Sequence, residues 1–416
     1  MSLDLDFVRA QFPAFELDEY RNQSFFENAG GSLACRHTID ALHRYYTETK
    51  VQPYSRYAPS VRAGHEMDAT LARWATALGC EWGEVSFGPS TSMNTYVLAQ
   101  AFAEILQPGD EVIVTNQDHE ANTGVFRRMA ERVGATVHEW RVDPSTGLLD
   151  QATFEALLSQ RTRLVSLPHC SNVVGQENPV ATWTALAHQV GARVICDGVS
   201  FAPHGLPDVA ALGVDVYLFS LYKVYSVHQG LMVARNGIID ELPNQGHWFN
   251  ADSPLKRLTP AGPDHAQIAA GGAVLDYLVD THLAHGGDEG DDLRRVAGAT
   301  ATLWQAHEAA LVTPVLDYLA GRDDLRLIGP AAVDAVSPDL HRCPTVAFVP
   351  RSKSAASVAR DLVDHGVMCN NGNFYAVRLL EGLDVATDPG VVRLSWVHYT
   401  DSADIDRLLN ALDEVL

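Results

Sequence analysis

Phe219-Ser-Leu-Tyr-Lys-Val-Tyr-Ser-Val-His-Gln-Gly230 follows an apolar, strand-like run and contains Lys223, one of only four lysines in the chain. Arginine fills nearly all of the other positions that carry lysine or arginine. The difference matters because lysine, unlike arginine, can lose its proton when partly buried and can form a Schiff base with an aldehyde. The stretch therefore indicates an amine with a chemical role at the end of a strand.

An acidic side chain follows the preceding strand. Ala192-Arg-Val-Ile-Cys196 reads as a buried strand and is followed by Asp197, so an acid and an amine come after two successive strands. In open α/β sheets, ligands bind at the carboxyl ends of the strands. Pyridoxal 5'-phosphate requires this pair, because a carboxylate keeps its pyridine nitrogen protonated and a lysine holds its aldehyde. We therefore predict a pyridoxal phosphate site built on Lys223 and Asp197.

Composition excludes several classes of function. The 416 residues are 46% hydrophobic and carry a formal charge of -22 without any cluster of Lys or Arg, which argues against nucleic-acid and anionic-membrane partners. The start of the chain is acidic and has no apolar signal core, so we expect a cytoplasmic protein. The six cysteines are scattered and the histidines form no His-Glu-x-x-His motif, so we expect reduced core thiols and no metal.

Strand-like runs rich in β-branched residues alternate with helical patterns between about residues 80 and 235. Such alternation predicts an α/β fold with a largely parallel sheet that is covered on both faces. The predicted strands are Val85–Phe87, Glu111–Thr115, Arg163–Leu167, Arg193–Cys196, Val214–Phe219 and Leu231–Ala234.

The pattern changes near residue 285. Two long helices are predicted over 264–285 and 291–320, separated by the Gly-Gly-Asp-Glu-Gly loop at 286–290. A smaller α+β pattern follows, with strands at 345–349 and 391–395 and helices near 354–365 and 402–415. We expect residues 21–285 to form a large domain that binds the cofactor. Residues 1–20 and 286–416 are then expected to form a small domain.

A phosphate site is predicted at the start of the helix that runs to about Leu106. Ser90, Thr91 and Ser92 follow a strand and open this helix. The N-terminus of a helix offers free N–H groups and the positive end of the helix dipole, and the hydroxyls add further donors. Ordinary N-capping is the alternative, because Ser and Thr favour that position in any case.

Two more polar side chains follow strands of the same sheet. His119 comes after the strand at 111–115 and could stack on the pyridine ring, although a histidine in a loop is often only a surface residue. Asn172 comes after the strand at 163–167 and could donate to the phenolic oxygen of the cofactor, but Asn is also common in turns. Each signal is weak alone, but four such signals follow four strands in turn.

The ordered series of motifs resembles the class V aminotransferase family of fold-type I pyridoxal phosphate enzymes, which includes cysteine desulfurases, selenocysteine lyases and isopenicillin N epimerase-like proteins. The resemblance spans nearly the whole chain, from Phe26 to Ser395, and implies a large α/β/α domain and a smaller α+β domain. The motifs that carry it are Asp118-His-x-Ala-Asn122, Ser171-Asn-Val-x-Gly175, Asp197-Gly-Val and Ser220-x-Tyr-Lys223.

The resemblance implies a role for each matching residue. Lys223 holds the cofactor aldehyde, Asp197 pairs with the pyridinium nitrogen and His119 stacks on the ring, and these three are the expected catalytic residues. Arg393 is expected to bind the substrate carboxylate as a bidentate guanidinium, bordered by Asn28, Ala29 and Gly30, although a surface charge at a strand edge is the alternative. The expected cofactor-binding residues are Ser90, Thr91, Ser92, Asn172, Ser200, Ser220, Tyr222 and Lys223.

Three departures from the family pattern affect how the cofactor is anchored. Ser200 stands where desulfurases usually have Gln near the phenolic oxygen. Ser226 and Val227 replace the Gly-Pro that commonly follows the lysine. The segment Pro260–Pro263 lacks the Thr that family members often lend across a homodimer to the partner's phosphate.

The largest departure concerns sulfur. Desulfurases use a cysteine on a mobile loop, whereas Cys369 lies within an apolar run of this chain and reads as a strand residue. We therefore predict a homodimeric β-eliminating C–S lyase that acts on an L-cysteine S-conjugate without a persulfide. The alternatives are decarboxylating oxidative deamination, transamination or epimerisation at the same site. A non-catalytic scaffold that binds the cofactor is a further alternative.

Overall fold

The computed structural model describes residues 2–334, 336–337 and 340–416. Its centre is a seven-stranded sheet, called the large sheet below, with strand order β2-β8-β7-β6-β5-β3-β4. Strands β3 to β7 run parallel, whereas β8 is antiparallel to both of its neighbours. The strands are β2 (Val85–Gly88), β3 (Glu111–Thr115), β4 (Thr136–Trp140), β5 (Thr162–Pro168), β6 (Arg193–Asp197), β7 (Val216–Ser220) and β8 (Gly230–Ala234). All six predicted strands are confirmed, and β4 is additional.

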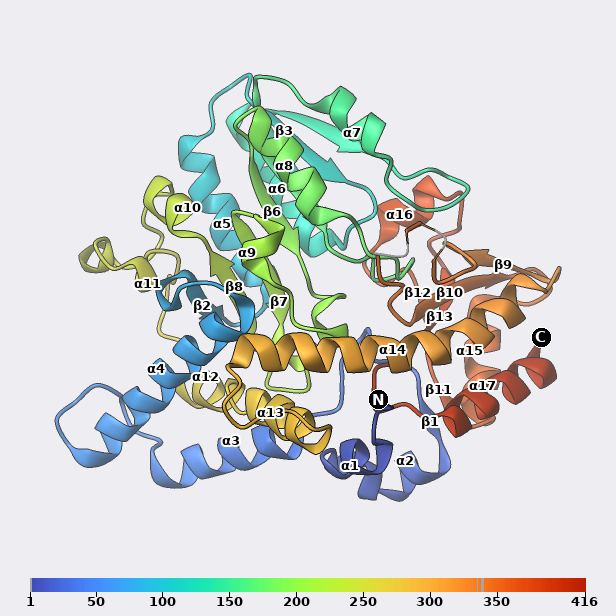
Figure 1. Cartoon of the computed structure of the whole chain (residues 1–416). Coiled ribbons are helices and arrows are strands. Elements are labelled where there is room, and N and C mark those ends of the chain that lie inside the picture. Colours follow the sequence, from blue (N-terminus) through green and yellow to red (C-terminus); the bar gives the residue numbers. More distant parts are fainter. Residues whose placement is uncertain (1, 335, 338–339) are drawn as a thin grey trace.

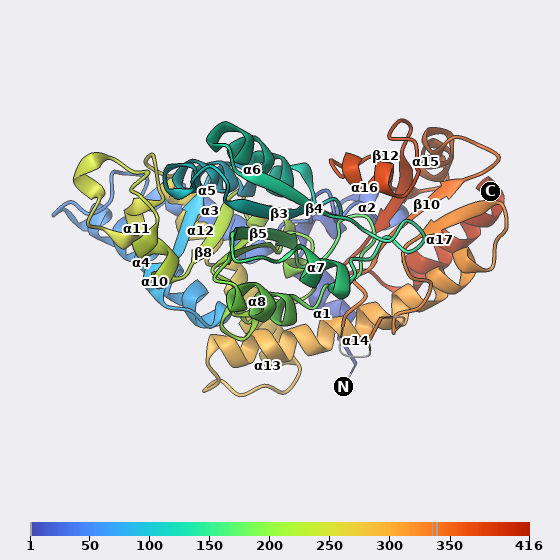
Figure 2. The same cartoon turned by 90° about the horizontal axis from the view of Figure 1, so that it is seen from above.

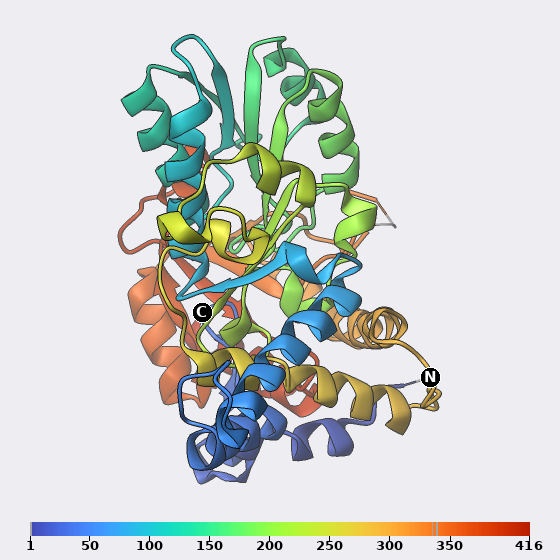
Figure 3. The same cartoon turned by 90° about the vertical axis from the view of Figure 1, so that its left-hand side faces the viewer.

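Helices cover both faces of the large sheet (Figures 1, 2 and 3). Alternate residues of one strand pack in opposite directions: Val112 and Val114 join a core with α5 and α6, while Ile113 joins the larger core on the other face. The fold is therefore the three-layer α/β/α arrangement that the alternating pattern predicts. The helices of this part are α3 (Arg36–Glu48), α4 (Ala58–Leu78), α5 (Thr91–Ile105), α6 (Glu120–Val133), α7 (Gln151–Leu157), α8 (Val180–Gln189), α9 (Val209–Leu212), α10 (Asn236–Glu241) and α11 (Pro254–Arg257).

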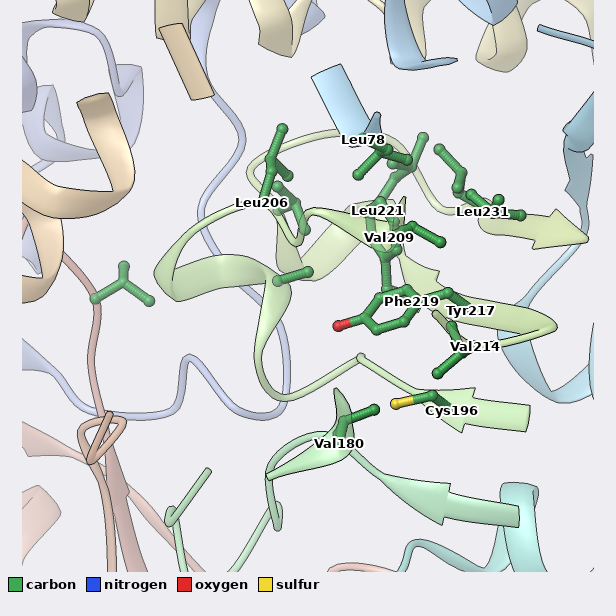
Figure 4. Packing of buried hydrophobic residues seen from close by; sticks show 14 of the residues in the cluster. Leu78, Val180, Cys196, Leu206, Val209, Val214, Tyr217, Phe219, Leu221 and Leu231 are labelled. Carbon is green, nitrogen blue, oxygen red and sulfur yellow. The ribbon is translucent and has the colours of Figure 1, made fainter. Parts of the chain in front are cut away.

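Apolar residues from β6 and β7 form the centre of the larger core. Tyr217 and Phe219 point to the same face of β7 and pack with Cys196 of β6, Val180 of α8 and Leu78 of α4 (Figure 4). Asp197 and Ser220 end these two strands. Because the strands are held by this packing, the polar residues that follow them are held at one edge of the sheet.

A second, four-stranded antiparallel sheet lies in the C-terminal part, with order β12-β13-β10-β9. It packs with α15, α17 and the second half of α14 around its own apolar core. The strand pair β1–β11 lies beside it. The bounds are β1 (Ser24–Phe25), β9 (Leu325–Ile328), β10 (Thr345–Pro350), β11 (Val367–Met368), β12 (Asn370–Gly372), β13 (Val391–Ser395), α14 (Leu293–Ala320), α15 (Ala355–Asp364), α16 (Val377–Gly382) and α17 (Ser402–Val415). The strands and helices predicted here are confirmed.

The single helix predicted over 264–285 is wrong. Two helices, α12 (His265–Gly271) and α13 (Val274–Ala284), are separated at Gly272. Helix α4 stabilises the break, because Trp74 Nε1 donates to the carbonyl of Gly271 at 3.1 Å and Arg73 donates to the carbonyl of Gly272. Two adjacent glycines also lower the helix propensity at this point.

Helix α14 connects the two cores. Val296 and Trp304 in its first half belong to the larger core, and Val312 and Leu316 in its second half belong to the smaller one (Figure 1). The N-terminal helix α1 (Leu5–Ala10) carries Arg9, whose guanidinium pairs with Asp401, the N-cap residue of α17, and with Asp404 in the first turn of α17. The division into residues 21–285 and residues 1–20 with 286–416 stays a prediction.

Within the residues that the structure describes, no helix has both the length and the hydropathy that crossing a bilayer requires.

Candidate active site

A pocket lies at the carboxyl ends of β3, β5, β6 and β7, where ligands bind in open α/β sheets. Its volume is about 480 Å³, including the part that is open to solvent. The sequence-predicted residues that line it are Thr91, Ser92, His119, Asn172, Asp197, Ser200, Ser220, Tyr222 and Lys223. The structure therefore brings together every predicted catalytic residue and every predicted cofactor-binding residue except Ser90.

Lys223 is the buried amine of this pocket. It ends the short 3₁₀ turn η4 (Leu221–Lys223), which follows β7 directly. Burial, with a smaller contribution from Arg393, lowers the pKa of Lys223 to about 8, while the charges of Asp197 and Glu27 act in the opposite direction. A substantial fraction of the amine is therefore neutral near pH 8, and a neutral amine can attack an aldehyde.

Two buried acidic side chains, Asp197 and Asp118, line the pocket. Asp197 ends β6, and its Oδ1 accepts a hydrogen bond from the backbone N–H of Val199 at 2.8 Å. Burial raises the pKa of Asp197, and Asp118 is a second buried carboxyl whose pKa is raised by burial and by Asp197. Two such groups would gain from a cation between or beside them, which is the charge of a protonated pyridine nitrogen.

His119 is the N-cap residue of α6. Its Nδ1 accepts a hydrogen bond from the N–H of Ala121 at 3.0 Å, which holds the orientation of the ring. Burial lowers the pKa of His119 to about 4, with Lys223 and Arg393 adding to the effect. The imidazole is therefore neutral, and its ring lies 5.2 Å from that of Tyr375 at an angle of 36°.

The hydroxyls that were predicted to bind the phosphate do not all face the pocket. Thr91 Oγ1 and Ser220 Oγ lie 2.7 Å apart in the pocket, beside the N-terminus of α5. A Cβ on Gly230 would lie 2.3 Å from the carbonyl carbon of Ser90, so glycine is needed in β8 for this helix to start here. Ser90 itself caps α5, because its Oγ accepts a hydrogen bond from Met93 N–H at 3.2 Å. This hydrogen bond is the one expected if Ser90 serves as an ordinary N-cap, which was the alternative to phosphate binding.

Asn172 and Tyr222 also line the pocket. Asn172 Nδ2 donates to the carbonyl of Phe374 at 2.9 Å, while its Oδ1 is buried without a hydrogen-bond partner among the described residues. The ring of Tyr222 stacks on His228 at 4.7 Å. An unpaired buried oxygen at the pocket wall is consistent with a polar ligand there.

Arg393 lies outside the lining of this pocket. It belongs to β13, and its side chain is 3% exposed, so it is not the surface charge of the alternative reading. Its Nη2 donates to Glu27 Oε1 at 2.7 Å, its Nη1 donates to the carbonyl of Asn172 at 3.2 Å, and the guanidinium lies 3.7 Å from the ring centre of Phe374. A substrate carboxylate would therefore compete with Glu27 for this arginine.

Asn28 and Ala29 line a smaller second cavity, which shares Ser200 and Lys223 with the main pocket. The N–H of Ala29 donates to Ser395 Oγ at 2.8 Å, and Gly30 contacts Glu27 instead of either cavity. The predicted carboxylate site is therefore split between this cavity and the Arg393–Glu27 pair.

Sequence reasoning gave no role to several residues of the site. Gln117, Asp118, Cys170 and Ser171 also line the main pocket, and Glu27 binds Arg393. Asp118 and Ser171 stand in the quoted motifs directly after β3 and β5, so their position in the motifs was a usable signal. The position of Glu27 gave no comparable signal, because it meets Arg393 across 366 residues of chain.

The donor set fits pyridoxal phosphate. The pocket offers an amine of lowered pKa for an aldehyde, buried carboxylates for a pyridinium, a flat neutral imidazole for a ring, and a helix N-terminus with two hydroxyls for a phosphate. In the described part of the chain, no three His, Cys, Asp or Glu side chains are arranged to hold a metal ion.

Comparison with known proteins identifies the class. The model of the aminotransferase class-V family matches residues 24–243. The aminotransferase-like protein FGM3 of Gibberella zeae is 32% identical over 100% of this chain and 99% of its own length. A probable cysteine desulfurase of Pseudomonas putida is 27% identical over 98% of this chain and 97% of its own. The crystal structure of the cysteine desulfurase CsdA of Escherichia coli superimposes with a TM-score of 0.83 at 24% identity, covering 100% of this chain and 99% of that one.

The chain belongs to the class V aminotransferase family, as its motifs predicted. It is a pyridoxal phosphate-dependent enzyme with the fold of the cysteine desulfurases, which confirms the predicted fold class and cofactor. The roles of the individual site residues stay predictions.

Proposed function

We propose that this enzyme is a β-eliminating C–S lyase that acts on an L-cysteine S-conjugate. The observation that carries the proposal is the environment of Cys369. Its Sγ lies 3.9 Å from the carbonyl of Ala359, and burial raises its pKa to about 12 with a smaller contribution from Glu27. A thiol held in this way is a poor nucleophile at neutral pH, so sulfur would leave as a free thiol and not as a persulfide on this residue.

Relatives named cysteine desulfurase support chemistry at the C–S bond of cysteine. The residues that would hold the cofactor are those of the main pocket: Lys223 at the aldehyde, Asp197 at the pyridine nitrogen, His119 against the ring, and Thr91, Ser92 and Ser220 at the phosphate. When bound, pyridoxal phosphate supplies an electrophilic carbon for the substrate amine and a ring that withdraws electrons from Cα.

The chain itself would move protons and orient the substrate. Lys223, partly neutral near pH 8, would take the Cα proton. Arg393 would bind the substrate carboxylate once Glu27 yields its place, and Asn28 would line the second cavity, which shares Lys223 with the main pocket. Loss of the Cα proton and of a thiolate from Cβ, followed by hydrolysis, gives a thiol, pyruvate and ammonia.

Transamination is the second candidate, because the relative with 32% identity is named aminotransferase-like. Its product would be a 2-oxo acid that still carries the sulfur substituent. The two reactions therefore leave different carbon skeletons from the same substrate.

A panel of S-substituted cysteines tests the proposal. Release of thiol and pyruvate in equal amounts supports the lyase, provided that Lys223→Ala abolishes it. A 2-oxo acid that retains sulfur, formed only when a second 2-oxo acid accepts the amine, would replace the lyase by an aminotransferase.

We also propose a cytoplasmic homodimer that needs no metal and binds no nucleic acid. Support for the dimer comes from aromatic side chains on the surface, including Trp248, which is 85% exposed, and Tyr54 and Phe249. Analytical ultracentrifugation is expected to give twice the chain mass of 45.3 kDa, and a monomer at micromolar concentration would contradict the dimer. Activity should be unchanged after treatment with a chelator.

A further inference from the structure

A carboxylate is completely buried in the middle of α14. The Glu308 side chain is 0% exposed, and its Oε2 lies 2.9 Å from Nδ1 of His204 and 3.6 Å from Nε2 of His341. Burial raises the pKa of Glu308, but the two imidazoles outweigh it and bring the pKa down to about 2. Glu308 is therefore charged, and a charged group in a core is stable only with a close partner, which is His204.

The chain around His204 brings it to this carboxylate. After β6 the chain forms the 3₁₀ turn η3 (Ala202–His204) and bends at Gly205, whose φ is +151°. A Cβ on Gly205 would lie 2.6 Å from Cβ of Ala301, so glycine allows this bend to lie against α14. Ala301 and Glu308 are seven residues apart and share one face of the helix.

His204 and Lys223 line the same small cavity, together with Ser200 and Trp396. The volume of this cavity is about 250 Å³, including the part that is open to solvent, which leaves room for a water. Glu308 occupies Nδ1 of His204, so Nε2 is the nitrogen left to exchange a proton. Among the described residues, neither this nitrogen nor the Lys223 amine has a hydrogen-bond partner, so each is left to bond to a water in the cavity that both residues line.

We propose that His204, positioned by Glu308, carries protons to and from the amine of Lys223 through a water in this cavity. The proposal rests on the proposed role of Lys223 as the reacting amine. When Lys223 releases a proton, the N–H bond breaks and the electron pair stays on Nζ. The proton passes to the water, and the water releases one of its own protons to Nε2 of His204.

The resulting imidazolium remains beside Glu308, whose negative charge stabilises it. The reverse transfer returns the proton to Lys223. Glu308 is a positioning residue in this scheme, because it acts only through the ring of His204.

Two titratable groups packed near His204, those of His398 and Tyr225, are uncharged. Burial lowers the pKa of His398 to about 3, so this ring is neutral. Burial also raises the pKa of Tyr225, whose hydroxyl donates to the carbonyl of Pro203. The ring of His341 lies 6.4 Å from that of His204, on the side of Glu308.

The test compares His204→Gln and Glu308→Gln with the matched control His282→Gln. His282 pairs with Asp291 at the same distance of 2.9 Å and is similarly shielded, but it lies on α13 and lines neither cavity that contains Lys223. Each holoenzyme is titrated with acid and base while the absorption of the bound cofactor is followed without substrate. The rate of deuterium uptake at Cα of a bound amino acid is then measured in D₂O, together with the Kd of that amino acid.

For His204→Gln we expect the midpoint of the absorption titration to move by at least about 0.5 pH unit and deuterium uptake to slow by at least about tenfold, with Kd unchanged. Glu308→Gln should change both quantities in the same direction, and His282→Gln should change neither. A His204→Gln enzyme with the wild-type midpoint and the wild-type rate overturns the proposal. An equal change in the control does so as well.

A measurement on the wild-type enzyme covers the case in which His204→Gln does not fold. The rate of deuterium uptake is measured in mixtures of H₂O and D₂O. A plot of this rate against the deuterium fraction of the solvent should be curved, because two protons move in the relay. A straight line overturns the proposal. Failure of the lyase is distinguishable: an enzyme that exchanges the Cα proton but releases no thiol refutes the proposed function alone.

Discussion

Replacing Lys223 with methionine should stabilise the cofactor-free protein while abolishing its chemistry. The pKa of Lys223 falls from 10.5 to about 8, chiefly through burial. At 1.36 kcal/mol per pKa unit, the fall from 10.5 to about 8 means that the charged amine costs about 3 kcal/mol in the folded state. Methionine has a similar length and no charge, so Lys223→Met avoids this cost.

The stabilisation should depend on pH in a defined direction. The folded lysine releases its proton more easily than the unfolded one, so the cost is complete below pH 8 and disappears as the pH rises toward 10.5. The advantage of Lys223→Met over the wild type is therefore expected to fall from about 3 kcal/mol at pH 7 to about 1 kcal/mol at pH 9.5.

Urea unfolding of the cofactor-free proteins, followed by circular dichroism at both pH values, measures this difference. Lys256→Met is the control, because Lys256 is exposed on α11 and its replacement should change the free energy of unfolding by less than about 0.5 kcal/mol. A wild type that is more stable than Lys223→Met at pH 7, or an advantage of the same size at both pH values, would refute the reasoning.

Three further variants test single contacts of the site. Glu27→Gln removes the charge that competes for Arg393, so spectral titration should show amino-acid carboxylates binding about tenfold more tightly, and unchanged affinity would contradict the competition. Cys369→Ser should retain turnover within about twofold, since its thiol is held protonated, whereas loss of turnover would indicate a sulfur carrier. Gly230→Ala places a Cβ against Ser90 and should weaken binding of pyridoxal phosphate by at least about tenfold in a fluorescence titration; wild-type affinity would argue against a phosphate at α5.

The large sheet was predictable from the sequence because each of its central strands is a short β-branched run with a polar residue at its end. Thr91, His119, Asn172, Asp197 and Ser220 stand at or just after such ends or at the start of the following helix, and a parallel sheet necessarily gathers these positions at one edge. The order of strands along the chain was therefore enough to assemble the main pocket.

Contacts between distant segments were not predictable in the same way. Glu27 and Arg393 are joined by the folding of the N-terminal segment onto β13, and no local pattern signals the pair. The break between α12 and α13 depends on donors from α4, which lie about 200 residues earlier in the chain. In both cases a contact between distant segments determines the local structure, while the hydrophobic periodicity of the sequence indicates only which residues form a helix or a strand.

The central claim is that Lys223 is the amine to which the cofactor is covalently bound. The most direct test is to reduce the holoenzyme with borohydride, digest it and locate the added pyridoxyl phosphate by mass spectrometry. The account predicts the label on the peptide that contains Lys223 and on none of the peptides with Lys50, Lys256 or Lys353. A label on one of those three lysines, or an active holoenzyme that carries no label after reduction, would contradict it.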